Sequence, residues 1–446
     1  MAIADKIIKE TRIKFIVICP KSIINTAWIA DANDFFPNMK IFPVKANMKK
    51  TDLRNYAEKY MGDRYATTTV ADLFDCVDVL VMNPEQFKRY CHGGIPSDYK
   101  GLIIDESTMI KSRTSQITKD ITDFSDKCKY VYILSGKPAP NSSMDYFTQI
   151  KIINPHLFGK GFTKFRDNFF FATDFMGYNW EMKAEKVELF SELLSLVSIF
   201  IPKEMCLDLP KKTYLIRNVN LKEKTMSAYN TMEKEQLLIL RDTAIAAPNK
   251  LASLMKLRQI SSGFIMDTEN SSVIDMDKSK INELESVLEE LGDKKAIIWV
   301  NFREEIRAIE ELMVSKGYTY VTAYQGTKDV DDSINKFKSN EAQFIIAHPK
   351  TLKYGVTFTG PSMKENCTYA IYYSLSFSYE DYYQSHDRIY RKGQTEPCTF
   401  IFLLSEDTID YTIYSCLQTK GERASLIEDL TRRLTSGKGN NSKSNN

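Results

Sequence analysis

A chain of 446 residues is too long for one ordinary hydrophobic core and suits two domains of about 150 to 200 residues with connecting helices. Its residues are 43% hydrophobic and 26% charged, which is typical of a folded protein and excludes wholesale disorder. Lys and Arg number 60 against 58 Asp and Glu, a net charge of +2, so a polyanionic partner would have to be bound by a local basic surface.

The eight cysteines form no CxxC pair and have no paired histidine spacing beside them. This pattern indicates reduced thiols, so we expect neither a disulfide framework nor a metal held by thiolates. No run approaches the roughly 18 apolar residues of a membrane span, and the first residues lack a signal segment. We therefore expect a cytoplasmic protein without a membrane partner.

Short apolar runs alternate with helical patterns along most of the chain, which is typical of parallel α/β sheets. The first half contains four such runs, at residues 14–19, 77–82, 102–104 and 130–134. The second half contains four more, at residues 296–300, 344–347, 369–373 and 399–404. The fold class is thus predicted to be α/β with two parallel-sheet lobes.

The predicted domain boundaries follow from the change in pattern between the two sets of runs. We expect the first lobe over residues 1–153 and the second over 277–428. Residues 154–276 contain aromatic and charged helical patterns without a comparable strand ladder, which predicts a helical insertion or linker region. Residues 429–446 have little to bury and are expected to form a flexible tail.

Two adjacent acids follow the buried run at 102–104, in the string GLIIDEST. Open parallel sheets bind ligands beyond the carboxyl ends of their strands, so Asp105 could anchor a hydrated Mg²⁺ and Glu106 could orient an attacking water. Two acids at a strand end also occur in ordinary solvated turns, and the context has to decide. About thirty residues later, Ser135 and Gly136 follow the next strand in a turn-forming segment that could couple this site to the other lobe.

The string QSHDRIYRKGQ, at residues 384–394 in the second lobe, carries two arginines. If this string is helical, Gln384, Arg388 and Arg391 fall at i, i+4 and i+7 and share one polar stripe. A guanidinium can bind phosphate oxygens and stabilise the charge on a transferring phosphoryl group. The alternative is a solvated basic helix that pairs with acids.

Together these strings resemble the motifs of the Swi/Snf-type branch of superfamily-two helicases. DEST resembles the DExx box, LSGKPAPN the coupling motif and QSHDRIYRKGQ the arginine motif, in the order of the family. The resemblance extends from about residue 3 to 414 through further strings, namely CPKSIINTAW, VMNPEQF, LRQISSGF, WVNFREEI, YGVTFTG and SEDTIDYTIY. It implies two RecA-like lobes, with ATP and Mg²⁺ as cofactors and nucleic acid, DNA in particular, as partner.

The resemblance also implies roles for single residues. Asp105 would bind the metal, Glu106 would activate water and Arg391 would be the arginine finger, while Arg388, Gln384 and Gly355 would contact the nucleotide. The nucleic-acid track would use Lys21, Ser22, Asn83 and Thr357, which suit contacts to the phosphate backbone. Ser135 and Gly136 would couple the two activities. Arg258 receives no role, because it could equally be a surface charge. The aromatic string NFFFATDF at 168–175 could stack on bases, but a packing role is favoured.

One family element is missing from these 446 residues. No GxxxxGK[ST] phosphate loop occurs, and the first ten residues resemble the helix that normally follows it. We therefore expect a truncation before or at this loop, a split gene, an upstream polypeptide that supplies the loop, or decay to a binding role. A smaller departure is Lys137, which stands where the family usually has threonine.

The leading hypothesis is an ATP-dependent helicase or translocase whose hydrolysis between two lobes drives movement along the nucleic-acid backbone. Weak or no hydrolysis is expected from this chain alone, because loop amides and a lysine would normally neutralise the phosphates. The alternative is a non-hydrolysing nucleic-acid-binding or assembly protein derived from such a motor. A nuclease ranks lower, since no additional acidic or histidine cluster is evident.

Without reader domains, the chain suggests a bacterial or viral protein, in a bacterial cell or virus-infected host. The motifs do not distinguish DNA from RNA, or strand separation from duplex translocation.

Overall fold

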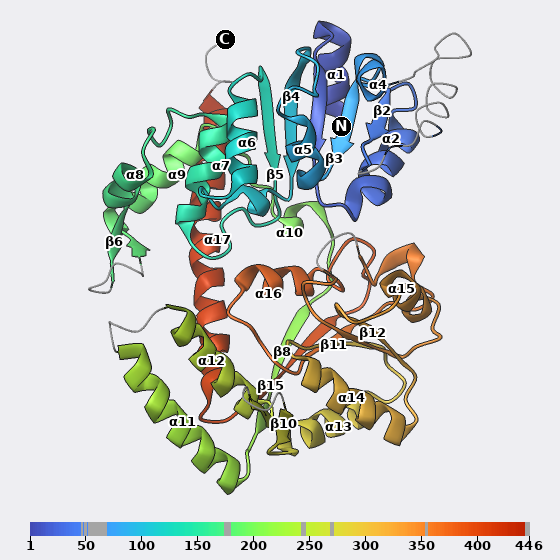
Figure 1. Ribbon diagram of the computed structural model, residues 1–446, viewed down its shortest axis with the longest axis vertical. Coiled ribbons are helices and arrows are strands. Elements are labelled where there is room, and N and C mark those ends of the chain that lie inside the picture. The colour runs from blue at the N-terminus through green and yellow to red at the C-terminus, as the bar shows by residue number, and fades with distance from the viewer. Residues whose placement is uncertain are drawn as a thin grey trace. The chain divides into compact units, whose positions relative to one another are not determined.

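The computed structural model in Figure 1 describes residues 1–45, 48, 51, 69–173, 180–241, 247–267, 272–352 and 356–441. The chain divides into two compact units. Unit 1 comprises Met1–Ile201 and Arg423–Asn446, and unit 2 comprises Pro202–Glu422.

Unit 1 is built on a five-stranded sheet in the order β2-β3-β1-β4-β5, in which all neighbouring strands are parallel. In chain order the strands are β1 (Lys14–Ile18), β2 (Ile41–Pro43), β3 (Val79–Met82), β4 (Tyr99–Asp105) and β5 (Tyr130–Leu134). Helix α1 (Ala2–Thr11) precedes β1, and the helices between the strands are α2 (Ala30–Phe35), α4 (Val70–Cys76), α5 (Pro84–Tyr90) and α6 (Gln116–Ser125). The sheet confirms the first predicted lobe.

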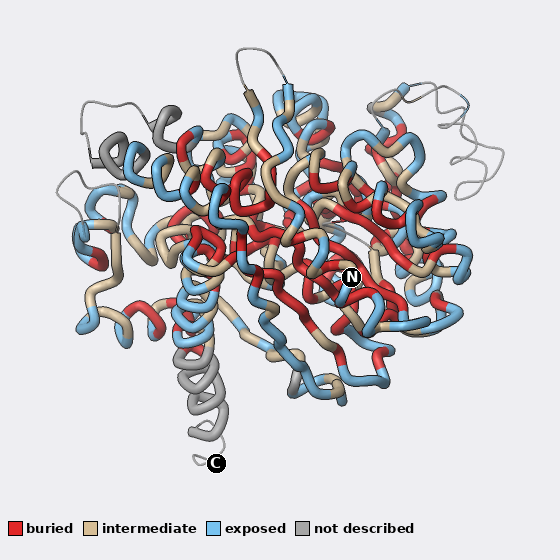
Figure 2. Tube along the Cα trace, turned by 90° about the horizontal axis from the view of Figure 1, so that it is seen from below, coloured by how far each residue is buried: buried red, intermediate tan, exposed pale blue. Residues whose placement is uncertain are grey.

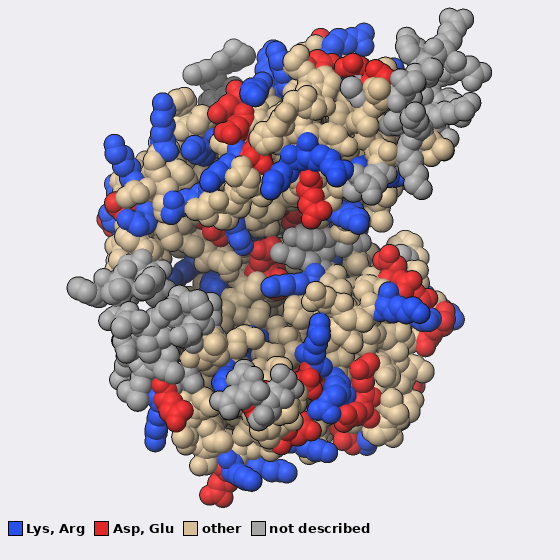
Figure 3. All heavy atoms as spheres, viewed as in Figure 1, with Lys and Arg blue, Asp and Glu red and all other residues tan. Residues whose placement is uncertain are grey.

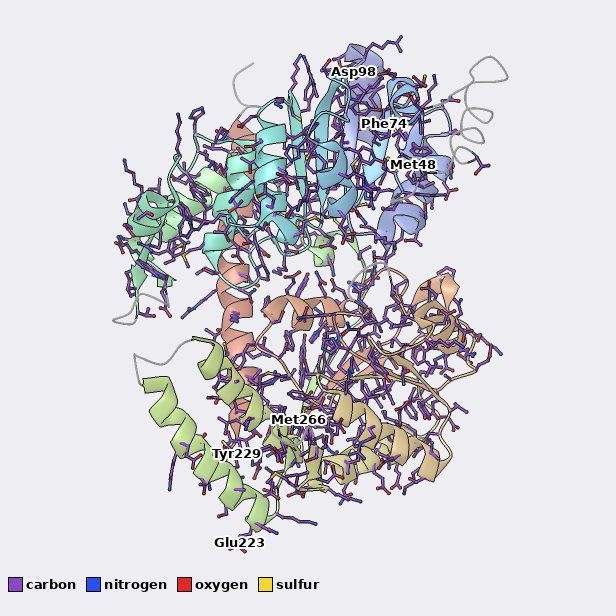
Figure 4. The ribbon with its side chains drawn as sticks, viewed as in Figure 1. Met48, Phe74, Asp98, Glu223, Tyr229 and Met266 are labelled. Atoms are coloured by element: carbon purple, nitrogen blue, oxygen red, sulfur yellow. The ribbon has the colours of Figure 1, made fainter. Side chains whose placement is uncertain are left out.

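Both faces of this sheet are covered, because alternate residues of each strand enter different hydrophobic clusters. Ile16 and Ile18 of β1 pack with residues of α4, α5 and α6, including Phe74, which Figure 4 labels. Phe15 and Val17 pack on the opposite face with residues of α1 and α2. Figure 2 shows long buried stretches of the chain in red. This two-sided burial explains why the strands read as unbroken apolar runs.

A separate aromatic cluster follows the first sheet in the chain. It combines residues of α7 (Tyr146–Ile153), α8 (Phe162–Phe169), the hairpin β6 (Phe170–Ala172) and β7 (Trp180–Met182), and α9 (Val187–Ser195). Ile427, from α17 (Ile409–Asn441), also belongs to it. The favoured packing role for NFFFATDF is confirmed at Phe169 and Phe170, which are buried, whereas Phe171 is exposed. The last residues of that string lie outside the described residues.

Unit 2 contains a six-stranded parallel sheet in the order β12-β13-β11-β14-β15-β8. Its strands are β8 (Lys212–Val219), β11 (Ala296–Trp299), β12 (Tyr320–Ala323), β13 (Phe344–Ala347), β14 (Tyr369–Tyr372) and β15 (Cys398–Ser405). Its helices are α10 (Lys203–Cys206), α11 (Glu223–Arg241), α12 (Ala247–Ser261), α13 (Ser279–Leu291), α14 (Arg303–Lys316), α15 (Val330–Lys338) and α16 (Tyr379–His386).

The core of unit 2 is also divided between the two faces of its sheet. Ile297 and Trp299 of β11 enter one cluster, which includes the buried Tyr229 of α11 labelled in Figure 4. Ala296 and Ile298 enter the other cluster, with residues of α13 and α14. The second predicted parallel-sheet lobe is thereby confirmed.

The structure corrects the prediction of a purely helical insertion over 154–276. This segment is shared between the two units, and it contains β6 and β7, the hairpin β9 (Phe264–Asp267) and β10 (Ser272–Asp275), and β8. The eight residues of β8 pair with β15 as an edge strand of the second sheet. The apolar-run criterion missed β8 because most of its residues are exposed, as is common for an edge strand.

Within the expected tail, α17 continues to Asn441, and the flexibility of this segment stays a prediction. Residues 429–441 contain no proline, and a helix that is already formed elongates readily through such residues. Among the described residues, no helix is long and apolar enough to cross a membrane.

Candidate functional site

The carboxyl ends of four parallel strands meet at one edge of the sheet in unit 1. The register aligns Ile18 of β1 with Met82 of β3 and Ile104 of β4, and it aligns Asp105 with Leu134 of β5. The predicted residues that end or follow these strands are Lys21, Ser22, Asn83, Asp105, Glu106, Ser135 and Gly136. The topology therefore brings all seven to the edge where parallel sheets bind ligands.

Asp105 is the last residue of β4, and both of its carboxylate oxygens accept hydrogen bonds. The indole Nε1 of Trp28 donates to Oδ2, and the backbone N–H of Glu106 donates to Oδ1, each at 2.9 Å. Burial raises the pKa of Asp105, and these two donors partly offset the rise. The two donors hold the Asp105 carboxylate in place. A cation close to the carboxylate would favour its charged form, so Asp105 is suited to bind a metal.

Trp28 is a site residue to which the sequence assigned no role. It lies in a π-helical turn, Ile24–Ile29, that follows β1, and its side chain is buried in the cluster formed with α1 and α2. Single π turns inside helices occur often at functional sites. Because its ring is buried and its N–H reaches Oδ2 of Asp105, Trp28 fixes the orientation of this carboxylate. The only sequence signal was the position of Trp28 at the end of the string CPKSIINTAW.

Glu106 has a left-handed backbone, with φ 56° and ψ 57°. This conformation costs a residue other than glycine about 1–2 kcal/mol, and such strain is often found at functional sites. Buried hydrogen bonds hold the turn: Ser107 Oγ donates to Gln149 Oε1 at 2.5 Å, and Gln149 Nε2 donates to the carbonyl of Pro138 at 2.6 Å. The acidic turn is thus tied, through the side chain of Gln149 in α7, to the segment that follows β5.

That second segment begins with Ser135 and Gly136. The hydroxyl of Ser135 is buried and has no hydrogen-bond partner among the residues that the structure describes. A Cβ added at Gly136 would meet no atom within 4 Å, so this position is open. Lys137, the departure from the family pattern, forms an ion pair with Glu428 of α17 at 2.5 Å. Lys137 therefore holds the end of α17 within unit 1.

The three polar residues predicted to contact nucleic acid in unit 1 differ in their surroundings. Lys21 and Ser22 are exposed in the turn after β1. Asn83 is 7% exposed, and its Oδ1 caps α5 by accepting the backbone N–H of Gln86 at 2.9 Å. The structure thus gives Asn83 a helix-capping role that the sequence did not predict.

The polar stripe expected in the second lobe is not a continuous helix. α16 ends at His386, so Gln384 is helical, while Arg388 and Arg391 lie in the turns that follow. The stripe pattern fails because the chain turns after Asp387, where the backbone N–H of Arg388 bonds to the carbonyl of Ser385. The prediction of a shared helical face is therefore wrong, although Gln384 and Arg388 remain in contact.

Arg388 is buried and forms hydrogen bonds with backbone carbonyls. Its Nε donates to the carbonyl of Gln384 at 3.0 Å, and its Nη1 donates to the carbonyl of Val356 at 2.6 Å. The carbonyl of Arg388 in turn accepts the N–H of Phe358. In the sequence, Thr357 lies between Val356 and Phe358, the two residues whose backbones bond to Arg388. Its hydroxyl and the Oε1 of Gln384 are buried without hydrogen-bond partners within the described ranges. Gly355, the remaining predicted contact, lies outside the described residues.

The end of the arginine motif packs against the same loop. Gly393 has φ +95°, and a Cβ at this position would lie 2.8 Å from Cα of Gly360, so both its backbone and its contacts require glycine. Gln394 is buried and donates to the carbonyls of Cys367 and Ile389. Arg391 alone among the predicted arginines is exposed. Most of this motif therefore holds the loop, and Arg391 is available to bind a ligand.

Arg258, for which a surface position was considered, is buried at 8% exposure in α12. Its Nη2 donates to the carbonyl of Leu375 at 2.7 Å, and its guanidinium lies over the ring of Phe302. Burial lowers the pKa of Arg258, and Glu305 and Asp410 oppose that effect. The surface alternative is wrong, and the residue supports the interior of unit 2.

Two family models match the chain. One, described as the SNF2-related domain, matches residues 3–263, and the other, described as the helicase conserved C-terminal domain, matches residues 279–393. The chain belongs to the SNF2-related family. The resemblance to Swi/Snf-type superfamily-two motors is thereby confirmed, and the two parallel sheets are its two RecA-like lobes.

Individual relatives are distant. Protein p41 of Acyrthosiphon pisum secondary endosymbiont phage 1 is 23% identical over 351 residues, which cover 74% of this chain and 72% of the phage protein. The SWI/SNF-related matrix-associated actin-dependent regulator of chromatin subfamily A-like protein 1 of Drosophila melanogaster is 20% identical, covering 94% of this chain and 51% of its own length. The DNA annealing helicase and endonuclease ZRANB3 of Mus musculus is also 20% identical, over 91% of this chain and 36% of its own. The chain thus spans about half or less of these two animal relatives.

Among solved structures, the Sulfolobus solfataricus SWI2/SNF2 ATPase core in complex with dsDNA is similar at 21% identity and a TM-score of 0.37. The match covers 98% of this chain and 86% of that chain.

Proposed function

We propose that this chain is an ATP-dependent translocase or helicase that acts on DNA, with Asp105, Glu106 and Arg391 serving one nucleotide. The observation that carries the proposal is the edge of the sheet in unit 1. There the fold gathers an anchored carboxylate, a strained acidic turn and a hydrogen-bonded link to the segment after β5.

A magnesium nucleotide fits the residues of unit 1 in part. The carboxylate of Asp105 is fixed by two hydrogen-bond donors. Burial raises its pKa, and a bound cation would lower that pKa again. Asp105 would therefore hold Mg²⁺ and Glu106 would orient the attacking water. When bound, magnesium neutralises charge on the phosphates, and ATP supplies the phosphoryl group that is transferred.

In unit 2, Arg391 would supply the charge that stabilises the transferring phosphoryl group. Its exposure supports this assignment. Arg388 serves as a positioning residue, since it binds the carbonyls of Gln384 and Val356 and thereby orders the loop that holds Thr357. Gln384 and Gly355 remain proposed contacts of the nucleotide.

DNA would be held through its backbone. Lys21 and Ser22 are exposed in one turn and suit phosphate oxygens. Thr357 would contribute from unit 2, and Asn83 would act through the start of α5, which its side chain caps. On the face in Figure 3, Lys and Arg alternate with Asp and Glu, in agreement with the net charge of +2. Binding should therefore depend on few phosphate contacts and weaken steadily with added salt.

The absence of a GxxxxGK[ST] string from these 446 residues limits the proposed activity. Without loop amides and a lysine on the phosphates, we expect the isolated chain to release phosphate slowly. The test is a phosphate-release assay with and without duplex DNA, and with duplex RNA as the comparison. Strong DNA-stimulated turnover by the isolated chain would contradict the expectation that it releases phosphate slowly. A separate polypeptide that carries the loop is part of the same proposal and should raise turnover when added.

A second candidate is a DNA-binding or assembly protein that does not hydrolyse ATP. The same missing string favours it, whereas the retained Asp105, Glu106 and Arg391 favour a motor. Equilibrium binding separates the two candidates. A motor should bind Mg²⁺-ATP with Asp105-dependent affinity, and the alternative should bind DNA but no nucleotide.

A further inference from the structure

Three side chains with metal-type ligand atoms cluster in unit 1, outside the site described above. Cys91 and His92 follow α5, and Asp120 belongs to α6. One ligand atom from each lies within 4.8 Å of the other two. We propose that this cluster binds a zinc ion through the thiolate of Cys91, a ring nitrogen of His92 and the carboxylate of Asp120. The ion would tie the end of α5 to α6.

The spacing within the cluster suits a shared metal better than a direct hydrogen bond. Nε2 of His92 lies 3.5 Å from Oδ1 of Asp120. A usual N–H···O hydrogen bond is about 2.9 Å long. Two ligands of a tetrahedral zinc ion, each bound at about 2.0–2.1 Å, lie about 3.4 Å apart. The separation between His92 and Asp120 is therefore close to the edge of a zinc tetrahedron, and the ligand atom of Cys91 lies within 4.8 Å of both.

Asp120 provides the independent observation. The residue is 3% exposed, and its Oδ2 has no hydrogen-bond partner in the part of the chain that the structure describes. A buried carboxylate oxygen without a partner is unfavourable, and a bound cation would compensate it. Nε2 of Gln116 donates at 2.7 Å to Oδ1, the oxygen that faces His92, and thereby holds the carboxylate beside that ring.

The ligand types and the turn that carries them also suit zinc. Thiolate and imidazole favour zinc over magnesium or calcium, and three protein ligands leave a fourth position for water. Gly93 has φ +111°, a conformation that favours glycine, and it lies in the turn that presents Cys91 and His92.

This site departs from the sequence expectation that no metal is held by thiolates. The spacing criterion would not detect such a site, because its ligands come from the turn after α5 and from α6 and include only one cysteine. The zinc proposal does not depend on the proposed ATP-dependent activity on DNA. Either proposal can therefore fail without the other.

The test uses the full 446-residue protein, reduced and stripped of metal, with cobalt(II) as the spectroscopic probe and zinc as competitor. One equivalent of cobalt should produce a thiolate-to-cobalt charge-transfer absorption, which zinc abolishes. The absorption should be lost in Cys91→Ser, and cobalt affinity should fall about 100-fold in His92→Ala and in Asp120→Asn. Gln116→Leu should weaken it about tenfold, the usual effect of losing a group that orients a ligand.

Matched controls are Cys76→Ser and His156→Ala, which change the same residue types elsewhere in unit 1 and should leave cobalt binding unchanged. His92 is exposed, with 70% of its side-chain surface accessible, so His92→Ala should fold even if Asp120→Asn does not. The proposal is overturned if the wild-type protein shows no charge-transfer absorption. It is equally overturned if the absorption persists at unchanged affinity in His92→Ala, which would indicate adventitious thiol binding.

Discussion

The two units use their motif residues in different ways. In unit 1, parallel strands deliver Asp105, Glu106 and Ser135 to one sheet edge, and a buried donor, Trp28, anchors the metal-type carboxylate. In unit 2, most of the arginine motif is internal, because Arg388 and Gln394 donate to backbone carbonyls. The comparison teaches that residues of one family motif can divide between holding a loop and presenting a single charge, which sequence spacing alone does not separate.

Separate substitution of the two arginines is the strongest test of this contrast between a buried and an exposed motif residue. Arg388→Met should lower the free energy of unfolding by about 3 kcal/mol, because buried carbonyls lose a charged donor. Arg391→Met should change it by less than about 0.5 kcal/mol, since an exposed side chain is lost. Urea denaturation of the full chain measures both. Equal effects of the two substitutions would show that the division between structural and exposed arginines is wrong.

Glu106→Gln tests the acidic turn of unit 1. Whatever phosphate release the wild-type protein shows, with or without an added loop-bearing polypeptide, should fall about 100-fold through loss of the group that orients water. Mg²⁺-ATP affinity should remain, because Asp105 is unchanged. Glu85→Gln, at the start of α5, is the matched control. Normal hydrolysis by Glu106→Gln would remove Glu106 from the site.

Acidification should affect unit 2 through His386. Burial lowers the pKa of His386 from 6.5 to about 3, so the folded protein keeps this ring neutral. The unfolded chain binds the proton near pH 6.5, and the contribution of His386 to stability is therefore present above that pH and lost as the pH falls toward 3. The loss should be about 1.5 kcal/mol between pH 6.5 and about pH 5.

Urea denaturation at the two pH values measures this loss, and His386→Asn, which does not titrate, provides the comparison. The variant should lose less stability than the wild type over the same interval. An identical pH dependence in both proteins would contradict the buried, neutral state of His386.

Trp28→Phe tests the assignment of Asp105 as a metal ligand, and its expected effect is the smallest of those predicted. The variant keeps an aromatic ring in the core but removes the donor to Oδ2. The Mg²⁺ concentration needed for nucleotide binding should rise about tenfold, the lower range for loss of a group that orients a metal ligand. Trp180→Phe, in β7, is the control and should leave that requirement unchanged. An unchanged requirement in Trp28→Phe would remove Trp28 from the site.

Sequence alone predicted the central strands, because buried parallel strands are continuous apolar runs, and it placed the two acids at the end of one of these strands. It missed β8, whose exposed edge residues lack that pattern, β2, which has only three residues, and β12, the other edge strand of the second sheet. It also missed the π turn that aims Trp28 and the burial of Arg388. Both depend on contacts between segments far apart in the chain, which no local periodicity records.

The central claim, that both units serve one nucleotide, is tested most directly by a double-mutant cycle on Mg²⁺-ATP affinity with Asp105→Asn and Arg391→Met. If the metal ligand and the guanidinium act on the same phosphates, the combined loss should differ from the sum of the single losses by about 1 kcal/mol or more. Strictly additive losses would contradict the claim and place the two residues at independent sites.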